Sequence, residues 1–195
     1  MTFVLAFYSF NLEITNSDSG VYHKARVKIP RHPQETLEQM YARVLAFTHS
    51  YEEGIEFSRG MFELREPSLW KKDVIGDIIS AVEVGSVDLE KLHRALKRRP
   101  IPRYSVYFYD QAQMQKFCHG MRGSTTNWIE DIHFFWIPPT LLQAIIPLEK
   151  SSSTWSLTFV DGTLYLTVDG TALETSITTL DMWAQFQESL GTQCA

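Results

Sequence analysis

Hydrophobic and polar residues alternate along both ends of the chain. Residues 2–15 and 21–29 each show a loose period of two, and the polar stretch NSDSG lies between them. Near the C-terminus, residues 155–177 alternate in the same way and are interrupted at Asp161-Gly162. A period of two is typical of strands with one exposed face, and an Asp-Gly pair favours a two-residue turn. The pattern therefore predicts a β-hairpin near the N-terminus and a hairpin or meander near the C-terminus.

The central part of the chain has longer apolar runs and helical periodicity. Apolar residues recur every three or four positions within residues 31–50, which predicts a helix with Pro33 and Glu35 in its first turn. Asp110, with Gln113 three residues later, is typical of a helix start. We expect further helices at 86–99, 110–120 and 139–146, strands at 55–64, 74–85, 104–109 and 131–137, and a loop or ragged strand at 65–73.

This order of elements predicts an α/β (α+β mixed) fold. A mixed β-sheet flanked by helices is the natural packing for strands and helices that alternate, and extra hairpins would lie at the N- and C-terminal ends. The central strands are almost continuously apolar, as strands covered on both faces are. With 195 residues, of which 44% are hydrophobic and 21% charged, we expect a single domain over residues 1–195.

Composition narrows the class of protein. The sequence lacks an apolar run long enough to span a bilayer, and the apolar start MTFVLAFYSF has neither a basic region nor a cleavage site, so we expect a first strand and no membrane association. Cys118 and Cys194 form neither a disulfide framework nor a zinc pattern. A reducing cytoplasm is the expected location.

Charge is distributed unevenly along the chain. The net charge is −5, but residues 1–124 carry 17 basic and 15 acidic side chains, whereas residues 125–195 carry one lysine and eight acids. Six basic residues fall within a short stretch: Lys91, Arg94, Lys97, Arg98, Arg99 and Arg103. This cluster predicts either a phosphate or nucleic-acid contact or a solvated helix end, because cations favour helix C-termini. The acidic third predicts either a contact with a protein partner or simple solubility.

One carboxylate lies inside an apolar strand. Glu83 is part of IISAVEVG, where an ionised side chain must be paired, hydrogen-bonded, protonated or bound to a metal. An ion pair with Arg59 or Arg65 is one explanation. The other is a metal site, because Glu66 ends the preceding strand and Glu35 starts the first helix. Carboxylate oxygens of this kind suit Mg²⁺ or Mn²⁺.

Several short motifs resemble the YaeQ family of bacterial proteins. RHPQET opens the first helix, FSRG and REPSLW follow it, and VEVG precedes the basic helix, in the order and spacing of that family. The resemblance implies a variant of the restriction-endonuclease-like fold, the PD-(D/E)xK class. It implies Mg²⁺ (or Mn²⁺) held by Glu66, Glu83 and a helix acid, which is Glu35 or, alternatively, Glu38.

The sequence departs from that nuclease signature at one position. The signature has a lysine two residues after the second strand acid, where this chain has Gly85. Lys91, Arg94 and Lys97 on the following helix are the candidate replacements, and Lys97 is our choice for the catalytic set with Glu66 and Glu83. Phosphate contacts are expected from Arg94, Lys97, Arg98, Arg99 and Arg103.

Two functions are compatible with these features. The first is a Mg²⁺-dependent nuclease or another enzyme acting on a phosphodiester. The second is a non-catalytic module that binds nucleic acid or protein on a degenerate nuclease scaffold, with Tyr104, Tyr107 or Tyr109 either stacking on bases or packed in the core. Neither a Walker A loop nor a GxGxxG loop is present, so nucleotide cofactors are not indicated.

Overall fold

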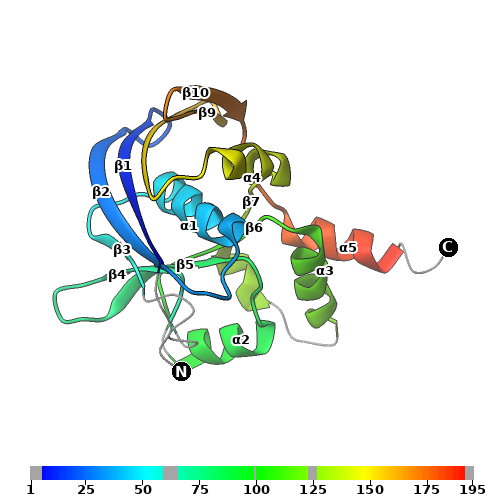
Figure 1. Cartoon of the computed structure of the whole chain (residues 1–195). Helices are drawn as coiled ribbons and strands as arrows, with labels where there is room; N and C mark the ends of the chain where they lie inside the picture. Colours follow the sequence, from blue (N-terminus) through cyan, green and yellow to red (C-terminus); the bar gives the residue numbers. More distant parts are fainter. Residues whose placement is uncertain (1–5, 59–65, 99, 123–126, 192–195) are drawn as a thin grey trace.

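In the computed structural model of the protein, which describes residues 6–58, 66–98, 100–122 and 127–191, eleven strands form two sheets. The first sheet has the strand order β10-β9-β8-β1-β2 (Figure 1). Its strands are β1 (Ala6–Asn16), β2 (Val21–Arg31), β8 (Ser152–Val160), β9 (Thr163–Val168) and β10 (Thr171–Thr175). The two predicted hairpins are therefore confirmed, but they are not separate additions. β1 pairs in parallel with β8, so both ends of the chain build one sheet.

The second sheet has the order β11-β7-β6-β5-β4-β3. Its strands are β3 (Ile55–Phe57), β4 (Leu69–Lys72), β5 (Ile78–Val84), β6 (Arg103–Phe108), β7 (Ile132–Trp136) and β11 (Thr178–Thr179). β5, β6 and β7 are parallel, whereas β3, β4 and β11 are antiparallel to their neighbours. The predicted mixed sheet is confirmed. Of the strand predicted at 55–64, β3 covers Ile55–Phe57, and residues 59–64 lie outside the described part of the chain.

Helices cover both faces of the second sheet. α1 (Leu37–His49) and α4 (Pro139–Ile145) lie between the two sheets (Figure 1). α2 (Leu89–Arg98), α3 (Gln111–Gly120) and α5 (Met182–Gly191) lie on the opposite face, together with a short 3-10 helix at Asn127–Asp131. A further 3-10 turn, Ile146–Leu148, follows α4. The result is a layered β-α-β-α arrangement.

Two apolar cores hold these layers together. The first lies between the sheets and buries nine of the thirteen residues of α1 against strands such as β1, β5 and β8. Its largest buried side chain is Trp155, whose ring lies 5.3 Å from that of Phe10. The second core joins the other face of β5, β6 and β7 to α2, α3 and α5. The sheet containing β5 is thus covered on both faces, as its apolar strands predict.

The start of α1 differs from the prediction. Thr36 is the N-cap residue, because its hydroxyl accepts a hydrogen bond from the Gln39 N–H at 3.1 Å. The helix therefore begins at Leu37, and Pro33 and Glu35 precede it. The predicted cap of α3 is confirmed: Asp110 accepts a hydrogen bond from the Ala112 N–H at 2.9 Å.

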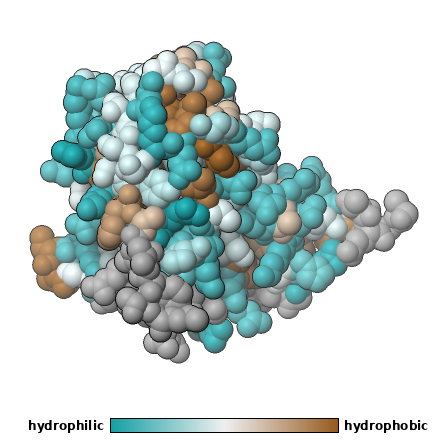
Figure 2. All heavy atoms as spheres, viewed as in Figure 1, coloured by the Kyte–Doolittle hydropathy of each residue, from teal (hydrophilic) through white to brown (hydrophobic). Residues whose placement is uncertain are grey.

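β4 and β5 form a hairpin that projects from the molecule. Its turn carries Val74 and Ile75, whose side chains are 104% and 80% exposed. Figure 2 shows this turn as a hydrophobic projection at the left of the view. Asp73 holds the turn by accepting hydrogen bonds from the backbone N–H groups of Ile75 and Asp77 at 3.0 and 2.9 Å. The segment 65–73, predicted as a loop or ragged strand, contains the short strand β4, whose register shifts between Lys71 and Lys72.

Candidate functional site

Glu83 projects from β5 toward the layer of α2 and α3. Its neighbours Val82 and Val84 pack into the first core, while Ala81, on the face of Glu83, packs into the second. The Tyr104 hydroxyl donates a hydrogen bond to Glu83 Oε1 at 3.2 Å. Burial raises the pKa of Glu83 to about 7, although the hydrogen bonds from Tyr104 and from the Ser68 backbone oppose the shift. Glu83 is therefore a carboxyl group that exchanges its proton near neutral pH.

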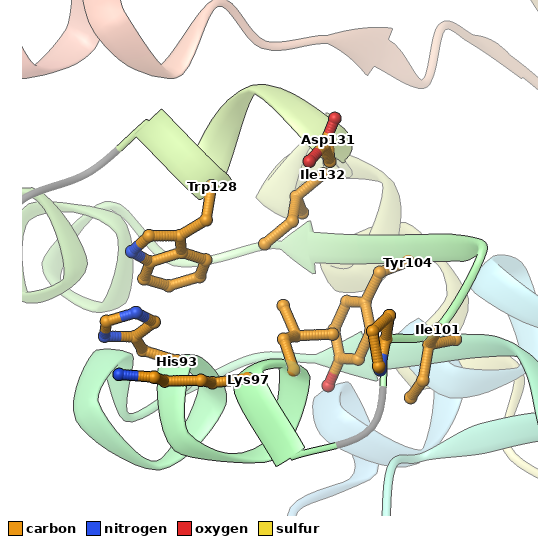
Figure 3. A pocket seen from close by; sticks show the side chains of 9 residues that line it. His93, Lys97, Ile101, Tyr104, Trp128, Asp131 and Ile132 are labelled. Atoms are coloured by element: carbon orange, nitrogen blue, oxygen red, sulfur yellow. The ribbon is translucent and has the colours of Figure 1, made fainter.

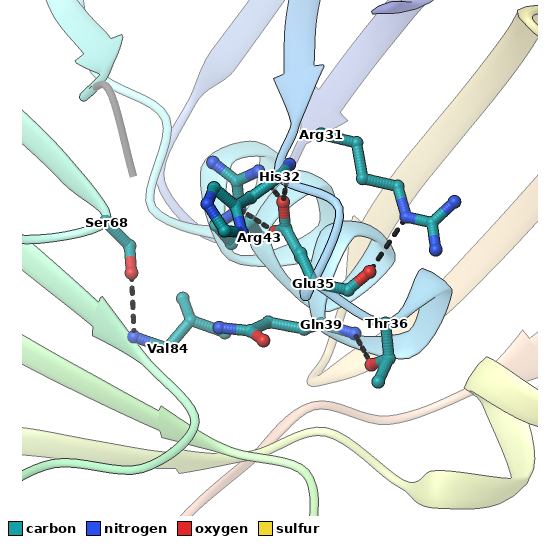
Figure 4. Close-up of polar contacts among 8 residues, drawn as sticks. All are labelled: Arg31, His32, Glu35, Thr36, Gln39, Arg43, Ser68 and Val84. Atoms are coloured by element: carbon teal, nitrogen blue, oxygen red, sulfur yellow. Dashed lines mark hydrogen bonds and ion pairs between the residues drawn. The ribbon is translucent and has the colours of Figure 1, made fainter. Parts of the chain in front are cut away.

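Glu66 lies on the segment that runs beside the end of β5. β4 and β5 are antiparallel with Leu69 opposite Val82, so the residues before Leu69 pass the last residues of β5. Ser68 Oγ accepts a hydrogen bond from the Val84 N–H at 3.2 Å, which fixes this segment (Figure 4). Oxygen Oε2 of Glu66 is buried and lacks a hydrogen-bond partner among the described residues. A buried carboxylate oxygen without a donor is costly, so this atom would gain from a hydrogen-bond donor or a cation.

Glu35 is in a different environment. Its side chain is only 2% exposed and forms a two-point ion pair with Arg43 of α1, with Nε–Oε1 at 2.7 Å and Nη2–Oε2 at 2.9 Å (Figure 4). The His32 N–H adds a bond to Oε2 at 3.3 Å. Burial raises the pKa of Glu35, and the Arg43 guanidinium opposes that shift. Both oxygens of Glu35 are thus engaged by protein donors.

The three predicted metal ligands therefore do not form one group. Glu35 is held by α1, which packs on the Val82 and Val84 side of β5, whereas Glu83 projects from the other side. Among the described residues, no cluster of three or more histidine, cysteine or acidic side chains is arranged to hold a metal ion. Glu35 also does not need a metal ion, because Arg43 already compensates its charge. Arg59 and Arg65, the alternative partners predicted for Glu83, lie outside the described residues.

Gly85 occupies the position of the signature lysine for a steric reason. Its φ angle is +90°, in the region that favours glycine, and its N–H donates to the Tyr107 carbonyl at 2.8 Å. A Cβ atom at this position would lie 3.2 Å from Cε1 of Tyr109. The end of β5 therefore disfavours any side chain here, and a lysine near Glu83 has to come from another element.

A pocket of about 440 Å³ lies beside Tyr104, between α2 and the starts of β6 and β7. His93 of α2 stacks on Trp128 with ring centres 4.7 Å apart and planes 3° apart (Figure 3). Lys97 is exposed at the same pocket, and Asp131 lines it from the 3-10 helix. Tyr104 thus lines the pocket and donates to Glu83, whereas the Lys97 amino group lies beside His93, away from the Tyr104 hydroxyl (Figure 3).

The basic cluster is only partly available for phosphate. Arg94 and Lys97 are exposed on α2, and Arg94 Nε donates to the Glu90 carbonyl at 3.2 Å. Arg103 is ion-paired with Glu52, which also binds Lys71 at 3.0 Å. The side chain of Arg98 and all of Arg99 lie outside the described residues.

The remaining sequence predictions have simple outcomes. Tyr104 and Tyr107 are buried, so the core interpretation holds for both, and Tyr107 packs on Phe135 with ring centres 4.8 Å apart. Trp128 and Asp131 were not predicted as site residues, because they follow no motif and are placed only by the fold. None of the helices in the described ranges is long and apolar enough to cross a membrane.

Comparison with known proteins places the chain in a family. The sequence matches the family model described as YaeQ protein over residues 1–177. The proteins named "Uncharacterized protein YaeQ" from Escherichia coli (strain K12) and Salmonella typhi are 22% and 23% identical to it over 171 residues. In both cases the match covers 88% of this chain and 93% of the relative.

Two solved structures have the same fold. The crystal structure of YaeQ protein from Pseudomonas syringae matches with a TM-score of 0.79 and 27% identity, over 90% of this chain and 96% of that one. The YaeQ protein from Xanthomonas axonopodis pv. citri matches with a TM-score of 0.81 and 20% identity, over 90% and 98% of the two chains. The motifs, the family match and the shared fold lead to one conclusion: this chain belongs to the YaeQ family.

Proposed function

We propose that the protein is a metal-dependent enzyme that acts on a phosphodiester, with Glu66 and Glu83 as the ligands of Mg²⁺ or Mn²⁺. The observation that carries the proposal is the buried Glu66 Oε2, which lies on the segment beside Glu83 and has no hydrogen-bond donor among the described residues. Glu83 is itself compensated only by hydrogen bonds from Tyr104 and the Ser68 backbone within the described residues. A divalent cation would satisfy both carboxyl groups.

The donor set fits magnesium better than a metal that needs a full protein cage. Mg²⁺ keeps several waters and is commonly bound through one or two carboxylates plus substrate phosphates. Two glutamates are therefore sufficient, and Glu35 is not needed. When bound, such an ion would polarise a phosphoryl oxygen and lower the pKa of a water ligand.

The chain's own residues supply the remaining parts. Tyr104 orients the carboxyl group of Glu83 through its hydrogen bond. Lys97, which lines the pocket beside Tyr104, would bind a phosphate, and Arg94 is exposed one turn earlier on α2. Lys97 would replace the signature lysine that Gly85 excludes. On this proposal the fold is a variant of the restriction-endonuclease-like, PD-(D/E)xK class, supported by an acid before β4 and an acid within β5.

Calorimetric titration with Mn²⁺ or Mg²⁺ tests the proposal. The wild type is compared with Glu66→Gln/Glu83→Gln, which keeps the shape of both side chains and removes their charge. The matched control is Glu53→Gln/Glu56→Gln, two exposed acids near β3. We expect about one ion per chain in the wild type and the control, and none in the first variant. A wild type that binds neither metal would refute the proposal.

The second candidate is a module that binds nucleic acid or protein without catalysis. One observation favours it: the described residues hold two candidate carboxylates rather than a group of three. Cleavage assays separate the candidates once metal binding is known. A metal-loaded protein that binds labelled DNA or RNA but leaves it intact would support the module, whereas Glu83-dependent cleavage would support the enzyme.

A further inference from the structure

The outer face of the five-stranded sheet carries an unusual set of side chains. Three of the exposed large hydrophobic residues lie on it: Phe7 (47% exposed), Tyr22 (73%) and Tyr165 (46%). Three cations are exposed on the same face of β2: Lys24, Arg26 and Lys28. We call these six residues the open face. In the burial pattern of β1, the residues that alternate with this face, such as Phe10 and Leu12, are buried in the first core.

Strand register places the aromatic side chains at defined distances. Tyr22 is opposite Thr15 on β1, Thr15 is opposite Thr158 on β8, and Thr158 is opposite Tyr165 on β9. Tyr22 and Tyr165 therefore lie in one row, about 14 Å apart at the usual strand spacing. Only two threonines separate them along this row. Two stackable rings are thus held apart by small side chains that leave room for planar groups between them.

The cations lie along β2, perpendicular to the row of residues that joins Tyr22 and Tyr165 across the strands. Lys24, Arg26 and Lys28 are spaced two residues apart, which is about 7 Å along a strand. Lys24 is paired with Glu13 on β1, and Lys28 lies over the Phe7 ring at 4.7 Å. Figure 2 shows the hydrophilic surface along β2 at the upper left. This edge of the sheet presents positive charge beside exposed aromatic rings.

From this arrangement we propose that the open face binds single-stranded nucleic acid. Bases would stack on Tyr22 and Tyr165, and phosphates would follow Arg26 and Lys28 on β2. Aromatic rings on an open sheet combined with a basic track are the physical requirements for such binding, and stacking is tolerant of base identity. Charge complementarity selects this partner over a second copy of the chain. An antiparallel pairing of two β2 edges would bring these cations close together, which like charge disfavours.

Fluorescence anisotropy with labelled oligo(dT) and oligo(U) of about 20 nucleotides tests the proposal. We expect Tyr22→Ala/Tyr165→Ala to weaken binding on the order of tenfold or more. The matched control, Val74→Ala/Ile75→Ala, removes exposed apolar side chains at the β4–β5 turn and should bind like the wild type. Arg26→Gln/Lys28→Gln should weaken binding and reduce the slope of log affinity against log salt by about 1.4, because each phosphate contact to a single strand contributes about 0.7. Its control, Lys72→Gln/Lys116→Gln, removes the same charge from other exposed positions.

Each outcome either supports or overturns the proposal that the open face binds single-stranded nucleic acid. Loss of binding in the open-face variants alone supports the proposal, and the preference between the two oligomers shows whether DNA or RNA is bound. Equal losses in the open-face and control variants would mean non-specific electrostatics and would overturn it, as would a wild type that does not bind. The assays are run in a chelator, so Glu66→Gln/Glu83→Gln should bind normally. If the proposed metal site proves wrong, the oligonucleotide-binding result still tests the open face.

Discussion

Glu35 and Glu83 are both acids in largely apolar surroundings, and they lie on opposite sides of β5. Glu35 meets Arg43 through two short contacts of 2.7 and 2.9 Å and receives a further bond from the His32 backbone. Glu83 receives a hydrogen bond from Tyr104 and one from the Ser68 backbone, and it forms no ion pair with a cation of the described residues. The same residue type, placed on opposite sides of β5, is thus compensated in one case by charge and in the other by neutral donors.

The difference indicates which of the two carboxyl groups can bind a metal ion or a proton. A carboxylate that is bound at two points by a buried guanidinium has its lone pairs occupied, so releasing it for a metal would leave Arg43 uncompensated. A carboxyl group held by neutral donors retains a raised pKa and gains from a cation or from a proton. Substitutions that remove the partner or the charge of each glutamate test this difference.

The largest expected effect comes from Arg43→Ala. The substitution leaves Glu35 buried without its cation and removes an arginine that is only 4% exposed. We expect the free energy of unfolding to fall by about 3–5 kcal/mol, measured by urea denaturation at neutral pH. The double variant Glu35→Gln/Arg43→Ala serves as the control and should recover part of the loss. A single variant within 1 kcal/mol of wild type, on the order of an exposed pair, would show that the ion pair is not important.

The second largest expected effect is a pH dependence of the free energy of unfolding, caused by Glu83. Its pKa is about 7 in the folded protein and about 4.3 in an unfolded chain, so between these values the folded state binds more protons. Stability should therefore fall as pH rises through this window and level off above it. Relative to wild type, Glu83→Gln should gain about 2–3 kcal/mol between pH 5 and pH 8.

Urea denaturation of wild type and Glu83→Gln at both pH values, in the presence of a chelator, measures this gain. The comparison of two proteins at each pH cancels the other titrating groups. Equal stability differences at the two pH values would contradict the raised pKa of Glu83. Adding Mn²⁺ should then stabilise the wild type more at pH 8 than at pH 5, because the metal binds the ionised form.

A smaller effect is expected at Gly85, next to the end of β5. Gly85→Ala must adopt φ near +90° and also contact Tyr109, whereas Gly20→Ala has a φ of +70° with open space around its Cβ. Alanine in this conformation costs about 1–2 kcal/mol, so Gly20→Ala measures the backbone cost alone. Gly85→Ala should be destabilised more than Gly20→Ala in the same urea assay. Equal losses would mean that the Tyr109 contact does not exclude a lysine.

Much of the fold follows from local sequence signals. The alternation in residues 2–15 and 21–29, the Asp161-Gly162 turn and the Asp110 cap all act over a few residues, and the structure has the hairpin of β1 and β2, the turn and the cap. The parallel pairing of β1 with β8 is different, because it joins segments more than 100 residues apart. Two amphipathic hairpins are compatible with several arrangements, and only the shared core decides between them.

The candidate site was predictable only in part. Glu83 was identifiable because a charge stands in an apolar run. The same reasoning applies to Arg43, which lies within MYARVLAF and so needs an acidic partner, but Glu35 lies in the polar stretch RHPQET and gives no such signal. The bulge near Lys71 and Lys72, which turns Ile78 to the face of Ala81, has no comparable signal. The Trp128 and His93 stack likewise depends on the fold alone.

The smallest expected change in the free energy of unfolding is for substitution of Arg103, and it serves as a comparison with the buried Arg43. Both arginines pair with a glutamate, but the Arg103 side chain is 56% exposed, and Glu52 keeps Lys71 as a second cation. Exposed pairs contribute about 0–1 kcal/mol, because water screens their attraction. Here Arg103 is exposed, whereas Glu52 is 17% exposed and keeps Lys71 when Arg103 is replaced. Arg103→Gln should therefore change the free energy of unfolding by less than about 1 kcal/mol. A loss as large as that of Arg43→Ala would show that burial is not what separates the two pairs, and the availability of Glu83 would then need another explanation.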